Sequence, residues 1–275
     1  MHEMNPELLH KAVDPETRHR LYLADFSSTH GFHENPNLSL GDADSGHLVM
    51  FGKLRPYGDV AVKPYETIGR AEHELEVIRH AQTLGFDTLE PLELSTLGRY
   101  VYLVTRYRPD LRHLGQLDWS TNIASRTLTK VITPTLHFAA DFAGKIHASG
   151  MSHGDFQAKN IARTREGSPV LADVENGQIR LKGKELAHKG NMDLIRFMSS
   201  ALRRGLLYDR SPNYRMKYLE NEFIVPALEA EGVSERDVVE ERKSQIAAKV
   251  SDVLRKQAIF DHPANNPRAH STTKV

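Results

Sequence analysis

The spacing of the apolar residues changes near residue 108, and this change limits the folds that the chain can adopt. Before that point, short apolar runs at 38–40, 47–51 and 59–63 are separated by glycine-bearing turns, which is the pattern of β-strands. Beyond it, most apolar residues recur with helical spacing. The sequence therefore predicts an α+β protein in which a strand-rich lobe is followed by a mostly helical one.

The strand-rich lobe is expected to span residues 38–107. Its first three runs form an antiparallel meander over 38–65, and a helix with one apolar face follows at 72–84. Two more strands are expected at 89–94 and 100–105. The prediction for this lobe is an antiparallel five-stranded sheet with one helix against it.

The helical lobe is expected to span residues 108–260, with a β-hairpin near its middle. A helical extension at 1–37 precedes the two lobes, and a polar, flexible tail follows them at 261–275. Helical periodicity places the helices of this lobe at 133–149, 192–207, 218–231 and 234–259, and the hairpin occupies 160–172.

Composition excludes several classes of protein. The chain has 275 residues, with 36 Lys+Arg, 36 Asp+Glu and no cysteine. Balanced charge gives no overall field that would attract nucleic acid or an anionic membrane, and disulfides and thiolate metal sites are impossible. The amino terminus lacks the layout of a secretory signal, and no run approaches the roughly 18 apolar residues of a membrane span. We expect a cytoplasmic protein without a nucleic-acid partner or a membrane span.

The segment 153–160 carries the most specific motif. It reads His-Gly-Asp at 153–155, with Asn160 five residues after Asp155, and it follows a helix that is expected to stop at Gly150. This spacing resembles the catalytic loop of the protein kinase-like superfamily. The resemblance implies that Asp155 orients an acceptor hydroxyl and takes its proton, while the amide oxygen of Asn160 binds magnesium.

Two further positions match the superfamily. Asp173 lies 18 residues after Asp155, on the far strand of the predicted hairpin, where the superfamily places a second metal-binding aspartate. The run Val-Ala-Val-Lys at 60–63 resembles the strand whose lysine contacts the α- and β-phosphates of ATP. The resemblance therefore implies that Lys63 binds ATP and that Asp173 is a ligand of Mg²⁺.

The helix after that strand should supply a carboxylate that pairs with Lys63, as it does in the superfamily. Glu74 is the best candidate, because the residues three, four and seven positions after it are apolar and place it at the edge of the apolar face. Glu72 and Glu76 are the alternatives.

The phosphate-covering loop is the least regular part of the resemblance. It runs from Gly41 to Gly46, with Ala43 in place of the middle glycine of the superfamily pattern. ATP is expected to lie between the lobes. The resemblance places its adenine against a hinge formed by Thr105, Arg106 and Tyr107.

The departures from the protein-kinase pattern indicate one branch of the superfamily. Gly154 stands where an arginine clamps a phosphorylated activation loop, and Asp193 follows only 20 positions after Asp173. These features resemble the aminoglycoside and choline phosphotransferases, the lipopolysaccharide-sugar kinases and the RIO-type atypical kinases. The resemblance implies a bilobal protein kinase-like fold in which His153 and Asp193 support the catalytic loop, with Asp193 at the opening of the next helix.

The predicted activity is an ATP- and Mg²⁺-dependent transfer of the γ-phosphate of ATP to a hydroxyl group. A small-molecule or sugar acceptor is slightly favoured, because the short segment after Asp173 leaves no visible platform for a peptide. An atypical serine/threonine protein kinase is the alternative. A pseudokinase that binds nucleotide or acts as a scaffold is a second alternative, and it is based on the irregular glycine loop.

Overall fold

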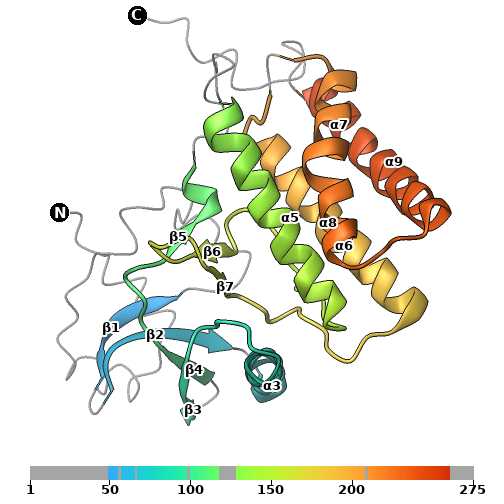
Figure 1. The fold of residues 1–275 in the computed structure, drawn as a ribbon. Coiled ribbons are helices and arrows are strands. Elements are labelled where there is room, and N and C mark those ends of the chain that lie inside the picture. The colour runs from blue at the N-terminus through green and yellow to red at the C-terminus, as the bar shows by residue number, and fades with distance from the viewer. Residues whose placement is uncertain are drawn as a thin grey trace, which may run out of the picture. The chain divides into compact units, whose positions relative to one another are not determined.

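The structure is a computed structural model, and it describes residues 49–54, 57–65, 67–97, 100–117, 128–207 and 210–260. The described chain contains two antiparallel sheets and a set of helices, so the predicted α+β class is confirmed (Figure 1). Several predicted features lie outside the described residues: the extension at 1–37, the strand at 38–40, the glycine-loop residues Gly41 and Gly46, and the tail at 261–275.

Contacts within the chain divide it into two compact units. The first unit comprises the described residues up to Gln116 together with Lys159–Gly177. The second comprises the described residues of Leu117–Ala158 and those from Gln178 onward. The hairpin that lies in the middle of the sequence thus belongs to the same unit as the strands near its beginning.

A four-stranded antiparallel sheet forms much of the first unit. Its strands are β1 (Met50–Leu54), β2 (Gly58–Tyr65), β3 (Pro91–Leu97) and β4 (Tyr100–Arg106), and their order in space is β1-β2-β4-β3. The valines of the two central strands are buried, as expected for β-branched residues in the interior of a sheet. The strands predicted at 47–51, 59–63, 89–94 and 100–105 are confirmed, with ends shifted by up to three residues.

Helix α3 (Ile68–Thr83) lies against this sheet. It begins four residues before the predicted start at 72. Its buried residues recur at spacings of three and four, so one face of the helix meets the strands. These residues are Ala71, Glu74, Val77, Ile78 and Ala81. The one acidic residue among them, Glu74, requires a partner inside the unit.

A second, three-stranded sheet joins β5 (Arg112–His113), β6 (Ile161–Arg163) and β7 (Pro169–Leu171), next to the short 3-10 helix η2 (Leu114–Gln116). Strands β6 and β7 form the predicted antiparallel hairpin. The amide of Leu171 donates to the carbonyl of Asp87 at 2.8 Å, and Nε2 of His73 lies 2.8 Å from the carbonyl oxygen of Gly177. The first contact attaches the hairpin to the loop after α3, and the second attaches the segment after the hairpin to α3 itself.

The second unit is helical. Helix α5 contacts α6 and α8, and α6 contacts α9 (Figure 1). A row of buried phenylalanine rings, Phe142, Phe156, Phe197 and Phe223, runs through its core with neighbouring centroids 4.5–6.3 Å apart. The elements are η3 (Leu128–Ile132), α5 (Thr133–Ala148), α6 (Gly183–Arg203), α7 (Pro212–Leu219), η4 (Glu220–Ile224), α8 (Val225–Ala230) and α9 (Arg236–Phe260).

Two of the predicted helices have different boundaries in the structure. Helix α6 begins at Gly183 rather than at 192, because its first turns are polar and carry no apolar stripe that would mark them. The single helix predicted at 218–231 is divided into the end of α7, the π-helical turn η4 and the short helix α8. Pro226, in the first turn of α8, lacks the N–H that a continuous helix needs.

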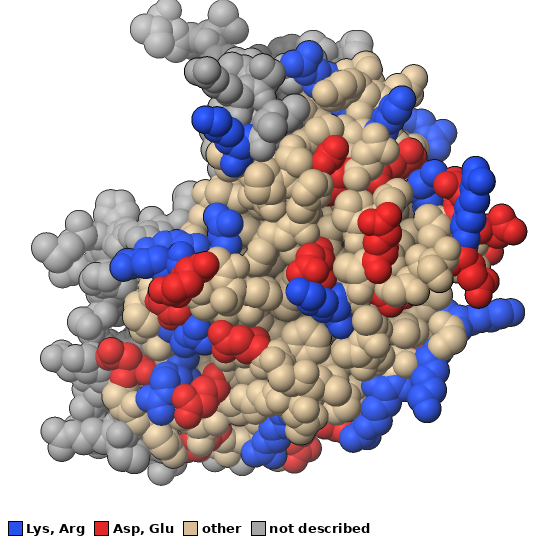
Figure 2. All heavy atoms as spheres, in the orientation of Figure 1, with Lys and Arg blue, Asp and Glu red and all other residues tan. Residues whose placement is uncertain are grey.

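Among the described residues, no helix is long and apolar enough to cross a membrane. On the face drawn in Figure 2, acidic and basic side chains are interspersed over the surface. This mixture of signs agrees with the equal numbers of acidic and basic residues in the sequence.

Gly144 allows α5 and α8 to approach each other closely. A Cβ atom added at Gly144 would collide with the Cβ of Ala230 and with the carbonyl oxygen of Ala227. A larger residue would therefore force the two helices apart.

Gly144→Ala is expected to lower the free energy of unfolding by about 1–3 kcal/mol, the usual cost of overpacking a core. Gly69→Ala in α3 is the matched control, because a Cβ added there meets nothing within 4 Å among the described residues. The control should be neutral or gain up to about 1 kcal/mol from helix propensity. Urea unfolding measures both changes, and equal stability of the two variants would show that this contact between α5 and α8 is absent.

Candidate functional site

Lys63 lies in β2, a central strand of the four-stranded sheet. It is opposite Leu103 of β4, and it is buried. Because residues two apart in a strand share a face, Lys63 lies on the same side as Tyr65, whose ring centre is 5.4 Å from the ammonium nitrogen. A buried ammonium group requires opposite charges close by.

Glu74 supplies the first of these charges. Its Oε2 accepts a hydrogen bond from Nζ of Lys63 at 2.9 Å, and the hydroxyl of Tyr65 also donates to it. Glu74 is buried on α3, whereas Glu72 and Glu76 are exposed. Of the three glutamates considered from the sequence, the structure brings Glu74 to Lys63.

Asp173 is the second partner of Lys63. Its Oδ1 accepts a hydrogen bond from Nζ at 2.6 Å. Asp173 follows β7, and its backbone is in the left-handed region with φ 55°, which aspartate tolerates better than most residues. Sparsely populated backbone conformations of this kind cluster at functional sites. The structure therefore unites Lys63, Glu74 and Asp173 from three separate segments of the chain.

Glu175 is a third partner of Lys63, and sequence reasoning missed it. Its Oε2 lies 3.1 Å from Nζ of Lys63, and its Oε1 lies 3.7 Å from Arg70. The sequence feature that could have identified Glu175 is the run Asp-Val-Glu at 173–175, in which two acidic residues flank a buried valine. Lys63 and its three carboxylates, Glu74, Asp173 and Glu175, are called the lysine cluster below.

The lysine cluster carries more negative than positive charge. Burial acts to lower the pKa of Lys63, but the three neighbouring carboxylates outweigh it and raise that pKa, so the ammonium group stays charged. Burial raises the pKa of Glu74, and Lys63 opposes this only in part. Three carboxylates thus face one buried ammonium, while Arg70 is 47% exposed. A bound cation would neutralise the excess.

Oxygen atoms suited to magnesium lie at one end of the hairpin. Asn160 immediately precedes β6 and Asp173 follows β7, and Ile161 is paired with Leu171 in this antiparallel ladder. Carboxylate and amide oxygens are the hard ligands that Mg²⁺ prefers. Within the described ranges, no group of three or more His, Asp or Glu side chains forms a metal site. An ion held by Asp173 and Asn160 would need further oxygen atoms, and phosphates commonly supply them.

In the second unit, the chain leaves α5 through a well-defined turn. Gly150 has φ 76° and ends the helix, as predicted. Its amide donates to the carbonyl of His147 at 2.9 Å, and the amide of Met151 donates to that of Ile146 at 3.2 Å. Ser152 and Gln178 then exchange two backbone hydrogen bonds of 2.9 and 3.0 Å. These bonds fix the chain directly before the His-Gly-Asp loop.

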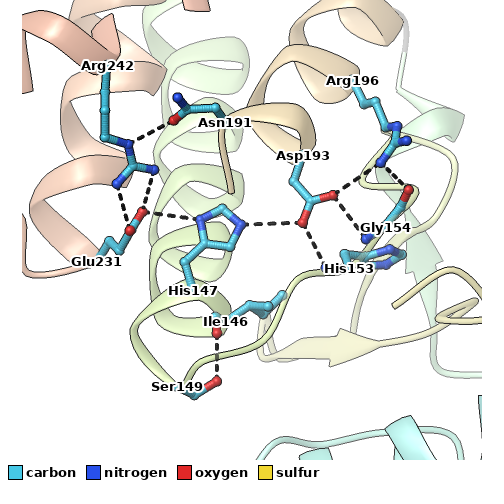
Figure 3. Close-up of polar contacts among 10 residues, drawn as sticks. All are labelled: Ile146, His147, Ser149, His153, Gly154, Asn191, Asp193, Arg196, Glu231 and Arg242. Atoms are coloured by element: carbon cyan, nitrogen blue, oxygen red, sulfur yellow. Dashed lines mark hydrogen bonds and ion pairs between the residues drawn. The ribbon is translucent and has the colours of Figure 1, made fainter. Parts of the chain in front are cut away.

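Asp193 holds the backbone of this loop (Figure 3). Its Oδ2 accepts a hydrogen bond from the amide of His153 at 2.7 Å, and its Oδ1 accepts one from the amide of Gly154 at 3.0 Å. Arg196, one turn further along α6, donates to the carbonyl of Gly154. The expectation that Asp193 opens its helix is wrong: α6 begins at Gly183, and the carboxylate reaches the loop from the helix interior.

The two side chains of the His-Gly-Asp motif have different surroundings. Asp155 is partly exposed, and its Oδ1 accepts a hydrogen bond from Nε2 of Gln157 at 2.5 Å, a contact that sequence reasoning missed. His153 is buried, and its ring meets that of Phe156 edge-on with centroids 5.5 Å apart. Neither ring nitrogen of His153 has a hydrogen-bond partner among the described residues. His153 therefore contributes to the loop through its amide and its ring packing.

The predicted hinge residues lie at the end of β4: Thr105 and Arg106 are its last two residues, and Tyr107 follows it. Thr105 is buried in β4. The amides of Arg106 and Tyr107 donate to the carbonyls of Glu90 and Asp59 at 2.9 and 3.1 Å. Because these two amides are engaged within the first unit, an adenine contact in this segment would have to use other backbone groups.

No protein-family model matches the chain, and no curated protein matches it either. Its function is therefore inferred from the lysine cluster and from the His-Gly-Asp loop.

Lys63→Met removes the cation of the lysine cluster and keeps an apolar stem of similar length. The free energy of unfolding is expected to fall by about 3–5 kcal/mol, the usual cost of removing one partner from a buried ion pair. Lys145→Met in α5 is the control, because Lys145 pairs with Asp141 at 2.7 Å on the surface and should contribute less than about 1 kcal/mol. Urea unfolding compares the two. If Lys63→Met lowers the free energy of unfolding by no more than Lys145→Met does, Lys63 does not neutralise the carboxylates of the lysine cluster.

Proposed function

We propose that the chain is an ATP- and Mg²⁺-dependent phosphotransferase with a bilobal protein kinase-like fold, and that it transfers the γ-phosphate of ATP to a hydroxyl group. The observation that carries this proposal is the lysine cluster. Lys63 on a central strand binds Glu74, 11 residues away on a helix, and Asp173, 110 residues away after a hairpin. A strand lysine, a helix glutamate and a metal-binding aspartate are the parts with which kinases hold the phosphates of ATP.

The residues of the first unit would bind the phosphates. Lys63 keeps its positive charge and is suited to the α- and β-phosphates, and Glu74 holds its side chain in place. Asp173 and Asn160 are the residues that would hold Mg²⁺, which when bound neutralises charge on the phosphates. The negative excess of the lysine cluster favours such a cation and disfavours ATP without one.

Asp155 would orient the acceptor hydroxyl and accept its proton. The loop amides fixed by Asp193 and the hydrogen bond from Gln157 both restrict the position of this carboxylate. Asp155 and Asn160 are five residues apart, so their Cα atoms can be separated by no more than about 18 Å. Most of the rate enhancement would come from positioning and charge neutralisation rather than from proton transfer alone.

A small-molecule or sugar hydroxyl is the favoured acceptor. Helix α6 begins at Gly183, so only nine residues lie between Asp173 and this helix. So short a segment leaves little chain for the platform on which protein kinases bind peptides. An atypical serine/threonine protein kinase is the alternative, and a pseudokinase that binds nucleotide without transfer is the second alternative.

Asp155→Asn is expected to reduce turnover roughly 10²- to 10⁴-fold, the usual contribution of a general base, while ATP binding persists. Asp173→Asn should abolish Mg²⁺-dependent turnover, because it weakens the metal site. Asp141→Asn is the control, since Asp141 is an exposed carboxylate on α5. The assay measures ATP consumption by the purified protein with Mg²⁺ and pools of sugars, amino alcohols and protein acceptors.

The acceptor that becomes phosphorylated distinguishes the alternatives. A phosphorylated sugar or amino alcohol supports transfer to a small-molecule or sugar hydroxyl, and a phosphorylated protein supports the atypical protein kinase. Mg²⁺-dependent ATP binding without turnover on any acceptor would indicate the pseudokinase. Turnover that is equal in wild type and in Asp155→Asn would refute the role of Asp155.

A further inference from the structure

A second buried network of charges lies in the helical unit, beside the loop that carries Asp155 (Figure 3). It consists of His147 in the last turn of α5, Asp193 in α6, Glu231 directly after α8 and Arg242 in α9. These four side chains are only 0–7% exposed. Charged groups at this depth are tolerated when they neutralise one another.

His147 lies between the two carboxylates of this network. Its Nε2 is 3.4 Å from Oδ2 of Asp193, and its Nδ1 is 3.4 Å from Oε2 of Glu231. Arg242 binds Glu231 through both guanidinium ends at 2.7 and 3.0 Å, and its Nε donates to Oδ1 of Asn191 at 2.8 Å. Each ring nitrogen thus has a carboxylate oxygen within ion-pair distance, and Nε2 also meets the geometry of a hydrogen bond, whereas Nδ1 does not. This arrangement suits the doubly protonated imidazolium, because neutral imidazole has only one N–H.

The buried charges balance only when His147 is protonated. Two carboxylates oppose one buried guanidinium, and Arg196, 3.7 Å from Asp193, is 41% exposed. Burial acts to lower the pKa of His147, but Asp193 and Glu231 outweigh it and raise that pKa. Burial acts to raise the pKa of Glu231, but His147 and Arg242 outweigh it and lower that pKa. Both shifts favour the imidazolium–carboxylate form.

Helix α6 packs closely against the ring of His147 at Gly190. A Cβ added at Gly190 of α6 would lie 3.0 Å from Nδ1 of His147 and 3.3 Å from Nη2 of Arg242. Among the described residues, the charged groups that face the ring are Asp193 from α6, Glu231 from the end of α8 and, behind it, Arg242 from α9.

We propose that protonated His147 is a positioning residue for the phosphotransfer reaction, because it joins the Glu231–Arg242 pair to the carboxylate of Asp193. That carboxylate holds the two loop amides directly before Asp155. Loss of the proton leaves one carboxylate facing a ring nitrogen that cannot donate, and the loop loses part of its support. The inference rests on the proposed function, since the group being positioned is Asp155.

The direction of the pH dependence follows from the raised pKa of His147. Below its unfolded value of about 6.5, the imidazolium makes its full contribution to stability. The contribution is lost as the pH rises through the higher, folded value. The turnover number should therefore fall on the alkaline side as His147 loses its proton.

The test compares the pH profiles of wild type, His147→Gln and His137→Gln in the full chain. His137 is the matched control, because it also lies on α5 with Nε2 2.8 Å from Glu222, but it is 52% exposed. Wild type and His137→Gln should show the alkaline decline in kcat. His147→Gln should lack it, with kcat at pH 6 roughly 10- to 100-fold lower and the KM for ATP unchanged. The same alkaline decline in His147→Gln would overturn the inference.

Glu231→Gln provides a second variant that keeps His147. Removing one of the two carboxylates should lower the pKa of His147, so the alkaline decline should move to lower pH. An unchanged pH profile in Glu231→Gln would also overturn the inference. This second variant keeps the test decisive if His147→Gln does not fold.

A further measurement is independent of phosphotransfer. Nitrogen NMR over a pH series should show that His147 keeps both ring protons to a higher pH in the folded wild type than histidine does in the unfolded chain. After correction for intrinsic exchange rates, hydrogen exchange should show reduced protection of the amides of His153 and Gly154 once His147 is deprotonated. A His147 that loses its second ring proton at or below the pH at which histidine does so in the unfolded chain, or protection that does not change, would overturn the inference even without turnover. If both expected results were obtained but the protein transferred no phosphate, the proposed function would be contradicted. The role of His147 in supporting the loop would still stand.

Discussion

The buried ammonium group of Lys63 is the interaction on which the rest of the first unit depends. It lies within 3.1 Å of three carboxylates, one from α3 and two from the segment after β7. It therefore joins the four-stranded sheet, the helix and the hairpin at a single point. The carboxylates would repel one another without it. The same permanent charge is the group best suited to a phosphate, so stability and the proposed nucleotide binding share one side chain.

The second unit uses a buried carboxylate for a different purpose. Asp193 accepts hydrogen bonds from two consecutive loop amides, and charged acceptors of this kind make stronger hydrogen bonds than neutral ones. A carboxylate at this depth is costly unless positive charge compensates it. His147 of α5 and Arg196 of α6 lie 3.4 and 3.7 Å from Asp193, and Arg242 of α9 compensates the neighbouring Glu231. In both units, the residues proposed to act on substrate are thus held by buried ion pairs that link distant segments of the chain.

Local spacing explains which parts of the site could be predicted from the sequence. Lys63 belongs to an apolar strand pattern, and the apolar positions after Glu74 mark it as the residue on the buried face of its helix. Glu175, Glu231 and Arg242 were missed because their partners lie on other elements, and the spacing along one element does not reveal such contacts. The beginning of α6 escaped prediction for a related reason, since its first turns are polar and show no apolar stripe.

Calorimetric titration of ATP into the wild-type protein and into Asp173→Asn, with Mg²⁺ and with a chelator, tests most directly whether the lysine cluster is a nucleotide site. We expect wild type to bind ATP at least about tenfold more tightly with Mg²⁺, a difference of roughly 1.4 kcal/mol. Asp173→Asn should lose this dependence on the metal. Equal affinity with and without Mg²⁺ in wild type, or no binding at all, would contradict the proposed phosphotransferase.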